Sequence, residues 1–365
     1  MKVFIVAGAR PNFMKIGPVY RAAAKYPSLN CKIIHTGQHY DLNMSDVFFR
    51  DLGLPEPNIH LGVGSGTHAE QSGQVMISYE KVLIDRQPDL VVVVGDVNST
   101  MAATLAAVKL GIKTAHLEAG LRSFDRSMPE EINRLVTDAL ADILWTPSAD
   151  GDENLIREGV SREKIQRVGN IMIDSLEMLR DKIQDQTAYS DFGLELQQYG
   201  LVTLHRPSNV DAPKKLAKLF DLLSRISKKI PLVFPIHPRT RKSADQIGIL
   251  SQLDQSKELI LLDPLNYVRF MNLVFNCRFA LTDSGGIQEE TTILKVPCIT
   301  LRPNTERPIT AEIGTSRIVG NDPQKIVEAW EDIQNDRWQT PTTPEMWDGK
   351  AAERIVSVIV ETWGN

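Results

Sequence analysis

Residues 282–290 contain the residue types that bind a phosphate group. Ser284, Gly285 and Gly286 follow a short apolar segment and precede a stretch that is compatible with a helix. The first N–H groups of a helix lack internal partners and the helix dipole favours an anion there, while glycine lets the backbone approach a phosphate closely. Glu290 is placed to accept hydrogen bonds from a ribose. The pattern predicts a sugar-nucleotide site, although an ordinary serine-capped helix after a glycine turn has the same pattern.

Two cations follow the apolar segment 3–8, which we expect to be the first strand. Arg10 comes directly after the glycine turn, and Lys15 lies near the expected start of the next helix. A guanidinium binds a pyrophosphate with two parallel hydrogen bonds, and an ammonium acts as a point charge. The pair therefore suits a diphosphate, but two solvated charges at a helix start remain an alternative.

Three carboxylates also stand where expected strands end or helices begin. Asp96 follows segment 90–95, Glu118 follows segment 113–117, and Glu130 lies in the first turn of an expected helix. Asp96 could instead cap a helix, and Glu130 could simply complement a helix dipole. Taken together, the three predict a set of groups for acid–base chemistry.

The second half of the chain adds cations and an aromatic side chain. His205 and His237 each follow an expected strand, and Arg307 lies close in sequence to the glycine turn. Two histidines at neighbouring strand ends favour a functional role. A metal site is not expected, because no third ligand stands at a recognisable spacing. Phe270 could stack on a base or pack in the core.

These residues must be positioned by strands that alternate with helices. In the first half we expect strands at 3–8, 32–36, 90–95, 113–117 and 143–147, and helices at 16–25, 69–86, 101–110 and 130–141. A second strand set is expected at 201–204, 232–236, 260–262, 279–282, 298–301 and 317–319. Nearly continuous apolar strands are typical of parallel sheets. The sequence thus predicts an α/β protein with two doubly wound, Rossmann-like domains that face each other across a cleft, at 1–170 and 171–345, followed by a C-terminal helix at 346–365.

Composition excludes several classes of protein. The 365 residues carry a net charge of −5, which gives no basic excess for nucleic acid, and the three cysteines show no metal-binding spacing. No apolar run is long enough to span a membrane, so we expect a soluble cytoplasmic protein without a membrane partner. There is no P-loop motif and no nucleophile elbow. Residues 62–67 lack the full glycine spacing of a dinucleotide fingerprint, so they are interpreted as a loop and no nicotinamide cofactor is expected.

The motifs, in this order, resemble those of the non-hydrolysing UDP-N-acetylglucosamine 2-epimerases over essentially the whole chain. The resemblance rests on Gly-Ala-Arg-Pro at 8–11, Gly-Gln-His at 37–39, Gly-Asp at 95–96, Glu-Ala-Gly-Leu-Arg at 118–122, Pro-Glu-Glu-Ile-Asn-Arg at 129–134, His-Arg at 205–206, Asp-Ser-Gly-Gly-Ile-Gln-Glu-Glu at 283–290 and Thr-Glu-Arg-Pro at 305–308. It implies the two-domain GT-B fold, a homodimer, and activity without a cofactor or metal.

The resemblance also implies roles for individual residues. The nucleotide would be held by Arg10, His205, His237, Phe270 at the uracil, Ser284, Gly285, Gly286, Glu290 at the ribose, and Arg307. The catalytic groups would be the carboxylates Asp96, Glu118 and Glu130, with His205 at the diphosphate and Lys15 at the sugar or leaving group. The implied reaction interconverts UDP-GlcNAc and UDP-ManNAc by elimination of UDP and its return to a 2-acetamidoglucal.

The chain departs from the commonest family pattern at three places. These are Asn12-Phe13 after Arg10-Pro11, Pro207-Ser208 after His205-Arg206, and Tyr40-Asp41 after Gln38-His39. The first and third also resemble epimerases that act on UDP-2,3-diacetamido glucuronates. Together the three departures touch the sugar side and the region where some family members bind a second, activating UDP-sugar, so allosteric activation is doubtful. A GT-B glycosyltransferase is the alternative of a different class. A hydrolysing relative is disfavoured, because such enzymes tend to carry Arg-Ala-Asp at residues 10–12.

Overall fold

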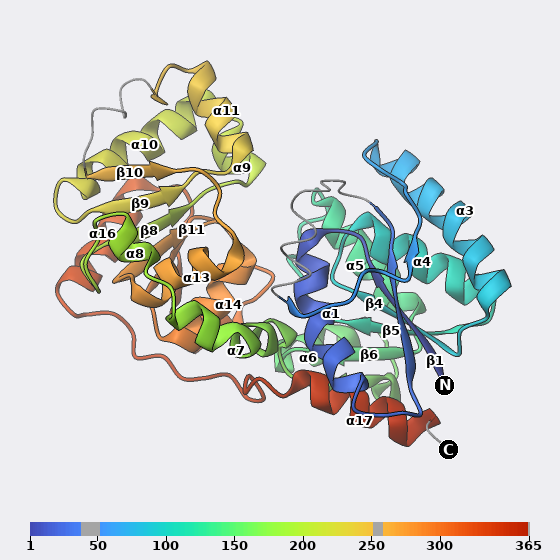
Figure 1. The fold of residues 1–365 in the computed structure, drawn as a ribbon. Coiled ribbons are helices and arrows are strands. Elements are labelled where there is room, and N and C mark those ends of the chain that lie inside the picture. The colour runs from blue at the N-terminus through green and yellow to red at the C-terminus, as the bar shows by residue number, and fades with distance from the viewer. Residues whose placement is uncertain (38–51, 251–257, 364–365) are drawn as a thin grey trace. The chain divides into compact units, whose positions relative to one another are not determined.

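The computed structural model describes residues 1–37, 52–250 and 258–363 and divides the chain into two compact units (Figure 1). Unit 1 comprises Met1–Met178 and Glu345–Asn365, and unit 2 comprises Leu179–Pro344. Helix α7 (Ile171–Gln184) carries the chain out of unit 1, and helix α17 (Ala351–Trp363) belongs to unit 1 again. The sequence does not decide which unit the last helix joins, and the structure assigns it to the first.

Unit 1 is built on a seven-stranded sheet with the strand order β3-β2-β1-β4-β5-β6-β7, in which every neighbouring pair is parallel. All five residues of β4 are buried, as expected for a strand that is covered on both faces. The strands are β1 (Lys2–Ala7), β2 (Asn30–His35), β3 (Ile59–His60), β4 (Leu90–Val94), β5 (Lys113–Leu117), β6 (Ile143–Thr146) and β7 (Ile165–Arg167).

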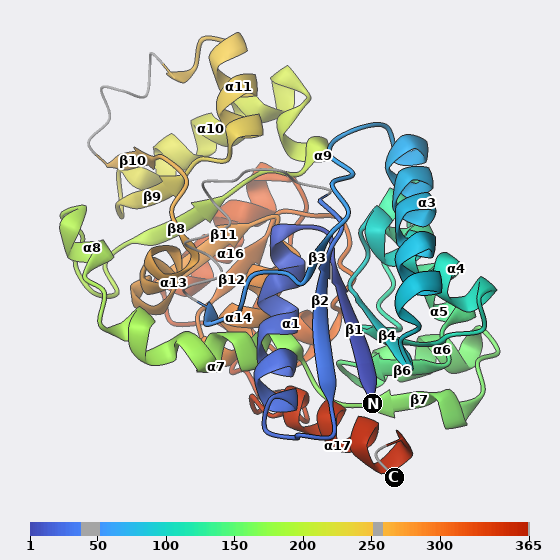
Figure 2. The ribbon, with the colours of Figure 1, turned by 45° about the vertical axis from the view of Figure 1, so that its right-hand side comes forward.

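Helices cover both faces of this sheet. Helices α3 and α4 bury Tyr79, Leu83 and Ala103 against the side chains of Phe4 and Val6. Helix α1 lies on the other side of strands β1 and β2, as Figure 2 shows. The remaining helix bounds are α1 (Arg10–Ala23), α3 (His68–Arg86), α4 (Asn98–Lys109), α5 (Pro129–Leu140) and α6 (Ala149–Arg157).

Unit 2 repeats the plan with a six-stranded parallel sheet in the order β10-β9-β8-β11-β12-β13. Helices α10 and α16 form a buried core with Val202, Phe234 and Leu281. The strands are β8 (Gly200–Thr203), β9 (Leu232–Pro235), β10 (Leu259–Leu262), β11 (Phe279–Thr282), β12 (Cys298–Thr300) and β13 (Ser316–Ile318). The helices are α8 (Ala188–Asp191), α9 (Pro207–Val210), α10 (Pro213–Ser227), α11 (Pro238–Gln246), α13 (Tyr267–Asn276), α14 (Gly285–Leu294), α15 (Ile309–Glu312) and α16 (Pro323–Gln334).

The expected pair of doubly wound α/β sheets is confirmed, but some elements differ. Helix α1 begins at Arg10 rather than at residue 16. Pro11 is compatible with a first turn, and the side chain of Asn12 accepts hydrogen bonds from the N–H groups of Gly8 (3.0 Å) and Ala9 (2.9 Å). Strands β3 and β7 were not expected from the sequence. The loop expected at residues 62–67 is confirmed, and Thr67 caps helix α3.

The strand orders place the predicted residues at one special position in each sheet. In unit 1 the order reverses between β1 and β4, and in unit 2 between β8 and β11. Ligands of open α/β sheets bind beyond the carboxyl ends of the strands at such switch points. Lys15 and Asp96 follow the two strands in unit 1, and His205 and Ser284 follow the two in unit 2.

No helix among the described residues is long and apolar enough to cross a membrane. Four residues of the resemblance, Gln38, His39, Tyr40 and Asp41, lie outside the described residues.

Candidate active-site residues in the two units

Gly95 marks the centre of the candidate site in unit 1. Its φ of 68° is typical of glycine, and a Cβ atom there would lie 3.3 Å from Nζ of Lys15 and 3.5 Å from Oε2 of Glu118. The amide nitrogen of Asn12 would lie 3.5 Å away. Side chains that follow β1 and β5 therefore meet beside the glycine that follows β4, directly before Asp96.

Lys15 and Glu118 form a buried ion pair through Oε2 of the carboxylate. Glu118 adopts a φ of 70°, and its side chain is only 4% exposed. A left-handed conformation at a residue other than glycine costs about 1–3 kcal/mol and is often found at active sites. The second oxygen, Oε1, is buried and makes no hydrogen bond within the described residues. Glu118 thus combines a strained backbone with a desolvated oxygen that has capacity to accept a proton or a hydrogen bond.

Asp96 is held by helix α5. Nη1 of Arg134 donates a hydrogen bond of 2.5 Å to Oδ2 of Asp96, and Nδ2 of Asn133 donates to the backbone oxygen of Asp96 at 2.8 Å. The Asp96 side chain is 33% exposed, whereas that of Arg134 is 2% exposed. The carboxylate is therefore presented at the surface of unit 1 by a buried cation, and it does not act as a side-chain cap of helix α4.

Glu130 and Glu131 have different environments in the first turn of α5. Glu130 is half-buried, and Glu131 is buried and accepts hydrogen bonds from the N–H groups of Ser123 (3.0 Å) and Phe124 (2.9 Å) and from Arg134 (2.6 Å). Burial acts to raise the pKa of Glu131, but the bonds from Ser123 and the charge of Arg134 outweigh it and lower that pKa. Glu131 therefore holds the loop that precedes α5.

A second buried network lies at the same end of the sheet and contains none of the predicted residues. Nδ1 of His116 lies 2.6 Å from Asp138, and Arg122 pairs with Asp138 and Glu158, each at 2.7 Å. Burial acts to raise the pKa of Asp138, but the interactions with His116 and Arg122 outweigh it, so the pKa is lowered. This network ties β5, α5 and α6 together.

Arg10 is the first residue of α1 and is half-buried. Burial lowers the pKa of its guanidinium. A partly desolvated cation at a helix start has reduced competition from water, and this favours binding of an anion.

In unit 2 the candidate site is organised by Asp283, whose side chain is fully buried. Its carboxylate accepts hydrogen bonds from the N–H groups of His205 (3.0 Å) and Arg206 (2.9 Å) and from Nδ2 of Asn209 (3.0 Å). Nδ1 of His205 also lies 2.9 Å from Asp283. Burial acts to raise the pKa of Asp283, but His205 and the backbone bonds outweigh it and lower the pKa. With Nδ1 facing Asp283, the half-exposed ring of His205 has Nε2 available for a ligand.

His237 lies beside His205, with ring centroids 5.7 Å apart. Nδ1 of His237 accepts a hydrogen bond of 3.1 Å from the N–H of Arg239. Burial, followed by the neighbouring His205, lowers the pKa of His237. The two histidines follow strands β8 and β9, which are neighbours in the sheet, as expected.

The glycine turn begins helix α14 as expected, with Ser284 as the N-cap residue but without a capping bond from its side chain. A Cβ atom on Gly285 would lie 2.8 Å from both Nη1 of Arg307 and Oε1 of Glu306, so only glycine fits without a shift of this pair. Arg307 pairs with Glu289 (2.7 Å) and Glu306 (2.8 Å). The guanidinium of Arg307 is thereby fixed against the start of α14.

Glu290 is fully buried and accepts a hydrogen bond of 2.7 Å from the hydroxyl of Tyr267. Burial, reinforced by the neighbouring Glu289, raises the pKa of Glu290 to about 8 against the opposing bond from Tyr267. Phe270 lies one turn after Tyr267 on α13 and is half-buried. Glu290, the predicted acceptor for a ribose, therefore already accepts a hydrogen bond from Tyr267. A ribose hydroxyl would have to displace this bond or add a second one.

A family model described as UDP-N-acetylglucosamine 2-epimerase matches residues 21–360. The chain belongs to the UDP-N-acetylglucosamine 2-epimerase family. The relatives of this epimerase-family chain include a Methanocaldococcus jannaschii protein named UDP-N-acetylglucosamine 2-epimerase, 43% identical over 98% of this chain and 99% of the relative. A Pseudomonas aeruginosa protein named UDP-2,3-diacetamido-2,3-dideoxy-D-glucuronate 2-epimerase is 40% identical over 90% of this chain and 91% of its own length.

Among solved structures, that of the M. jannaschii epimerase in complex with UDP-GlcNAc and UDP is similar, with a TM-score of 0.90. The match has 42% identity and covers 99% of this chain and 100% of the other. Two expectations are thus confirmed: the chain has two Rossmann-like sheets, and it belongs to this epimerase family.

Three residues that form hydrogen bonds to the predicted site residues were not selected from the sequence. Arg134 and Asp283 stand inside motifs that the resemblance uses, and Tyr267 stands three residues before Phe270. The motifs were the available signal for the first two. Their partners, Asp96 and His205, are distant in sequence, so only the fold reveals the contacts.

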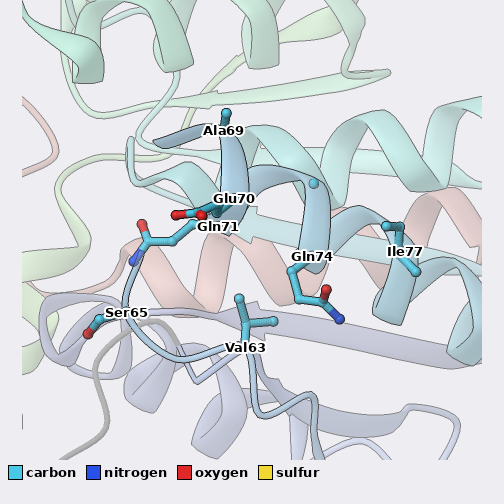
Figure 3. A pocket seen from close by; sticks show the side chains of 8 residues that line it. Val63, Ser65, Ala69, Glu70, Gln71, Gln74 and Ile77 are labelled. Carbon is cyan, nitrogen blue, oxygen red and sulfur yellow. The ribbon is translucent and has the colours of Figure 1, made fainter. Parts of the chain in front are cut away.

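Unit 1 of the epimerase-family chain also has a pocket of about 500 Å³ beside α3, which Figure 3 shows. Ser65 and Gln71 lie at one end and Ile77 at the other. None of the predicted site residues lines it. Within residues 1–37, 52–250 and 258–363, no group of three or more His, Cys, Asp or Glu side chains is arranged to hold a metal ion.

Proposed function

We propose that the chain is a non-hydrolysing UDP-N-acetylglucosamine 2-epimerase, which interconverts UDP-GlcNAc and UDP-ManNAc. The observation that carries the proposal is the 43% identity, over 98% of the chain, to the M. jannaschii protein of that name. The glycosyltransferase alternative has no comparable support, because the matching family model is that of the epimerases.

The chemistry of the substrate sets what the residues must do. The C2 hydrogen of a pyranose has no adjacent carbonyl, so direct removal as a proton is unfavourable. Breaking the C1–O bond first gives C1 oxocarbenium character and acidifies C2–H. UDP then leaves with the bonding electron pair, a carboxylate takes the C2 proton, and 2-acetamidoglucal forms. Protonation of C2 from the other face and return of UDP to C1 give the epimer.

In unit 2 the proposed task is to bind UDP and to stabilise it as a leaving group. The N-terminus of α14 at Ser284, Gly285 and Gly286 would accept the diphosphate, together with His205. The hydrogen bond between His205 and Asp283 supports this role, because it orients the imidazole before the ligand arrives. His237, Phe270, Glu290 and Arg307 would complete nucleotide binding, and Arg10 of unit 1 would add a cation for the diphosphate.

In unit 1 the proposed task is proton transfer at C2. Glu118 is the first candidate for the base, because Oε1 is buried without a hydrogen bond from any described residue and Lys15 pairs with the other oxygen. Asp96 and Glu130 would complete the set that exchanges protons on the two faces of the sugar. Lys15 would also steady the sugar or the departing diphosphate.

A second substrate has specific support. The P. aeruginosa relative that acts on a UDP-2,3-diacetamido glucuronate by name is 40% identical to this chain. Asn12, the first departure from the commonest family pattern, bonds only backbone groups within the described contacts, at Gly8, Ala9 and Val94. The residue therefore shapes the turn before α1, and its identity does not by itself favour either sugar.

The test is incubation of the protein with UDP-GlcNAc in deuterated water, followed by NMR. Deuterium at C2 and the appearance of UDP-ManNAc with the sugar still bound to UDP are the expected results. Free sugar would indicate hydrolysis and contradict the proposal. Exchange only with the diacetamido glucuronate substrate would identify the second candidate. We also propose a homodimer, as the resemblance implies, and sedimentation equilibrium at micromolar concentration would measure it.

A further inference from the structure

Arg134 occupies a central place in unit 1 that the proposed mechanism does not use. Its side chain is 2% exposed, and its guanidinium faces two carboxylates from different segments. Nε and Nη2 donate to Oε2 of Glu131 at 3.1 and 2.6 Å, and Nη1 donates to Oδ2 of Asp96 at 2.5 Å. One edge of the guanidinium is thus anchored on its own helix, and the opposite nitrogen reaches the end of β4.

The anchor of Arg134 is itself fixed. Glu131 accepts hydrogen bonds from the backbone of Ser123 and Phe124, and Nη2 of Arg134 reaches Oγ of Ser123 at 3.4 Å. A planar guanidinium bound along one edge has little freedom to rotate, so Nη1 points in a set direction. The position of Oδ2 of Asp96 follows from this chain of contacts.

We propose that Arg134 is a positioning residue for proton transfer, which holds Oδ2 of Asp96 so that Oδ1 is the oxygen that exchanges a proton with the substrate. The inference rests on the proposed function, because it assigns Asp96 to the acid–base set. Asn133 assists by bonding the backbone oxygen of Asp96, so two consecutive residues of α5 fix both the main chain and the side chain of Asp96. Glu130 lies one turn before Arg134, so α5 carries both Glu130 and the arginine that holds Asp96.

Lysine cannot replace arginine at this position without loss. An ammonium is a point charge, and it lacks the fork that spans Glu131 and Asp96 at the same time. We therefore expect Arg134→Lys to lower kcat by about 10-fold and Arg134→Gln by about 100-fold, with KM changed by less than about 3-fold. Loss in kcat alone is the signature of a group that acts on the chemical step.

The experiment measures C2 deuterium incorporation for the wild type, Arg134→Gln, Asp96→Asn and the double variant. If Arg134 acts through Asp96, adding Arg134→Gln to the Asp96→Asn variant lowers the rate by less than about 3-fold. Full additivity of the two effects would overturn the inference, as would a wild-type kcat in Arg134→Gln. Partial retention of kcat in Arg134→Lys is also expected, and equal loss in the Arg134→Lys and Arg134→Gln variants would contradict a positioning role.

Arg122 provides the matched control. It is also a buried arginine of unit 1 that pairs with two carboxylates, Asp138 and Glu158, but it has no described contact with Asp96. Arg122→Gln should lower the thermal unfolding temperature about as much as Arg134→Gln, but should reduce kcat less. Equal losses of kcat would show that Arg134 matters only for the fold. A wild type that exchanges no deuterium with either candidate substrate would reject the proposed function, and the inference with it.

Discussion

At the switch point of its sheet, each unit has a half-exposed polar side chain that is bonded to a more deeply buried charged side chain, and the chemical roles of the two are reversed between the units. In unit 1 the carboxylate of Asp96 is 33% exposed and its cationic partner Arg134 is 2% exposed. In unit 2 the imidazole of His205 is 37% exposed and its anionic partner Asp283 is fully buried. Unit 1 therefore exposes a carboxylate that is held by a buried guanidinium, and unit 2 exposes an imidazole that is held by a buried carboxylate.

The difference matches the tasks proposed for the two units. A proton acceptor must be available to the sugar, whereas an anionic diphosphate requires a donor or a cation. In both cases the group that would meet the substrate is oriented by a buried partner with several further hydrogen bonds. The comparison predicts that exposed members control ligand binding or chemistry, and that buried members control stability and orientation.

The largest expected effect concerns Glu118, a proposed proton acceptor of unit 1 that lies outside the two compared pairs. Glu118→Gln should lower C2 deuterium incorporation by about 10³-fold, because an amide cannot accept the proton. Binding of UDP, measured by calorimetry, should change by less than about 2-fold. The exposed Glu80 of α3 is the control, and Glu80→Gln should keep the wild-type rate. Unchanged exchange in Glu118→Gln would remove Glu118 from the base set.

The next prediction separates the buried from the exposed member in unit 2. Asp283→Asn should lower the free energy of unfolding by about 2–4 kcal/mol, because buried donors lose charged acceptors. His205→Asn should cost less than about 1 kcal/mol but should weaken UDP binding by about 10-fold or more. Denaturant unfolding and calorimetry measure the two quantities. The reverse order of stability losses would contradict the comparison.

A third prediction uses Gly285 and Gly286, the two adjacent glycines of the turn proposed to bind the diphosphate. Gly285→Ala should lower the unfolding free energy by about 1–3 kcal/mol, because its Cβ would meet Arg307 and Glu306 at 2.8 Å. Gly286→Ala places its Cβ in open space within the described structure and should be neutral or stabilising by about 0.5–1 kcal/mol in a helix. Thermal unfolding measures both. Equal melting temperatures for the two variants would show that the Arg307–Glu306 pair moves freely.

A fourth prediction concerns the pH dependence of stability. The pKa of buried Glu290 is raised to about 8, above its unfolded value near 4.5, so folding takes up a proton between these pH values. This contribution is fully present below about pH 4.5 and is lost as pH rises to about 8. Relative to Glu290→Gln, the wild type should therefore lose up to about 1.4 kcal/mol per pH unit in that window, with no further loss above it.

Denaturant unfolding of the wild type and the Glu290→Gln variant from pH 5 to pH 9 measures this difference. Tyr267→Phe is the control, because it removes the hydrogen bond to Glu290 but leaves the carboxyl group to titrate. Parallel stability curves for the wild type and Glu290→Gln would show that the group is ionised when folded.

Most strands could be predicted because their residues are apolar along the whole element, as in β4. Strand β7, Ile165–Arg167, has no such pattern, and its pairing with β6 is visible only in the fold. The start of α1 was predicted too late, because the side chain of Asn12 serves the exposed N–H groups of the first turn in a way that sequence spacing does not reveal.

The predicted site residues came from motifs, each of which is local in sequence. The motifs indicated that Lys15 and Glu118 do chemistry, but not that they pair. Ion pairs between residues so distant in the chain depend on which strands become neighbours, and the reversal of strand order between β1 and β4 decides this. For the same reason the buried partners Arg134 and Asp283 required the structure.

The path of the chain also has a consequence for biosynthesis. Unit 2 is one continuous segment, Leu179–Pro344, whereas unit 1 needs its last portion, Glu345–Asn365, to be complete. That portion brings Trp347, which bonds the backbone oxygen of Pro147 at 2.9 Å, and α17 with its buried Ile355. On the ribosome, where domains usually mature in the order of synthesis, the unit begun first must finish last. While unit 2 is being synthesised, unit 1 is therefore incomplete, and the surface on which α17 later packs is uncovered.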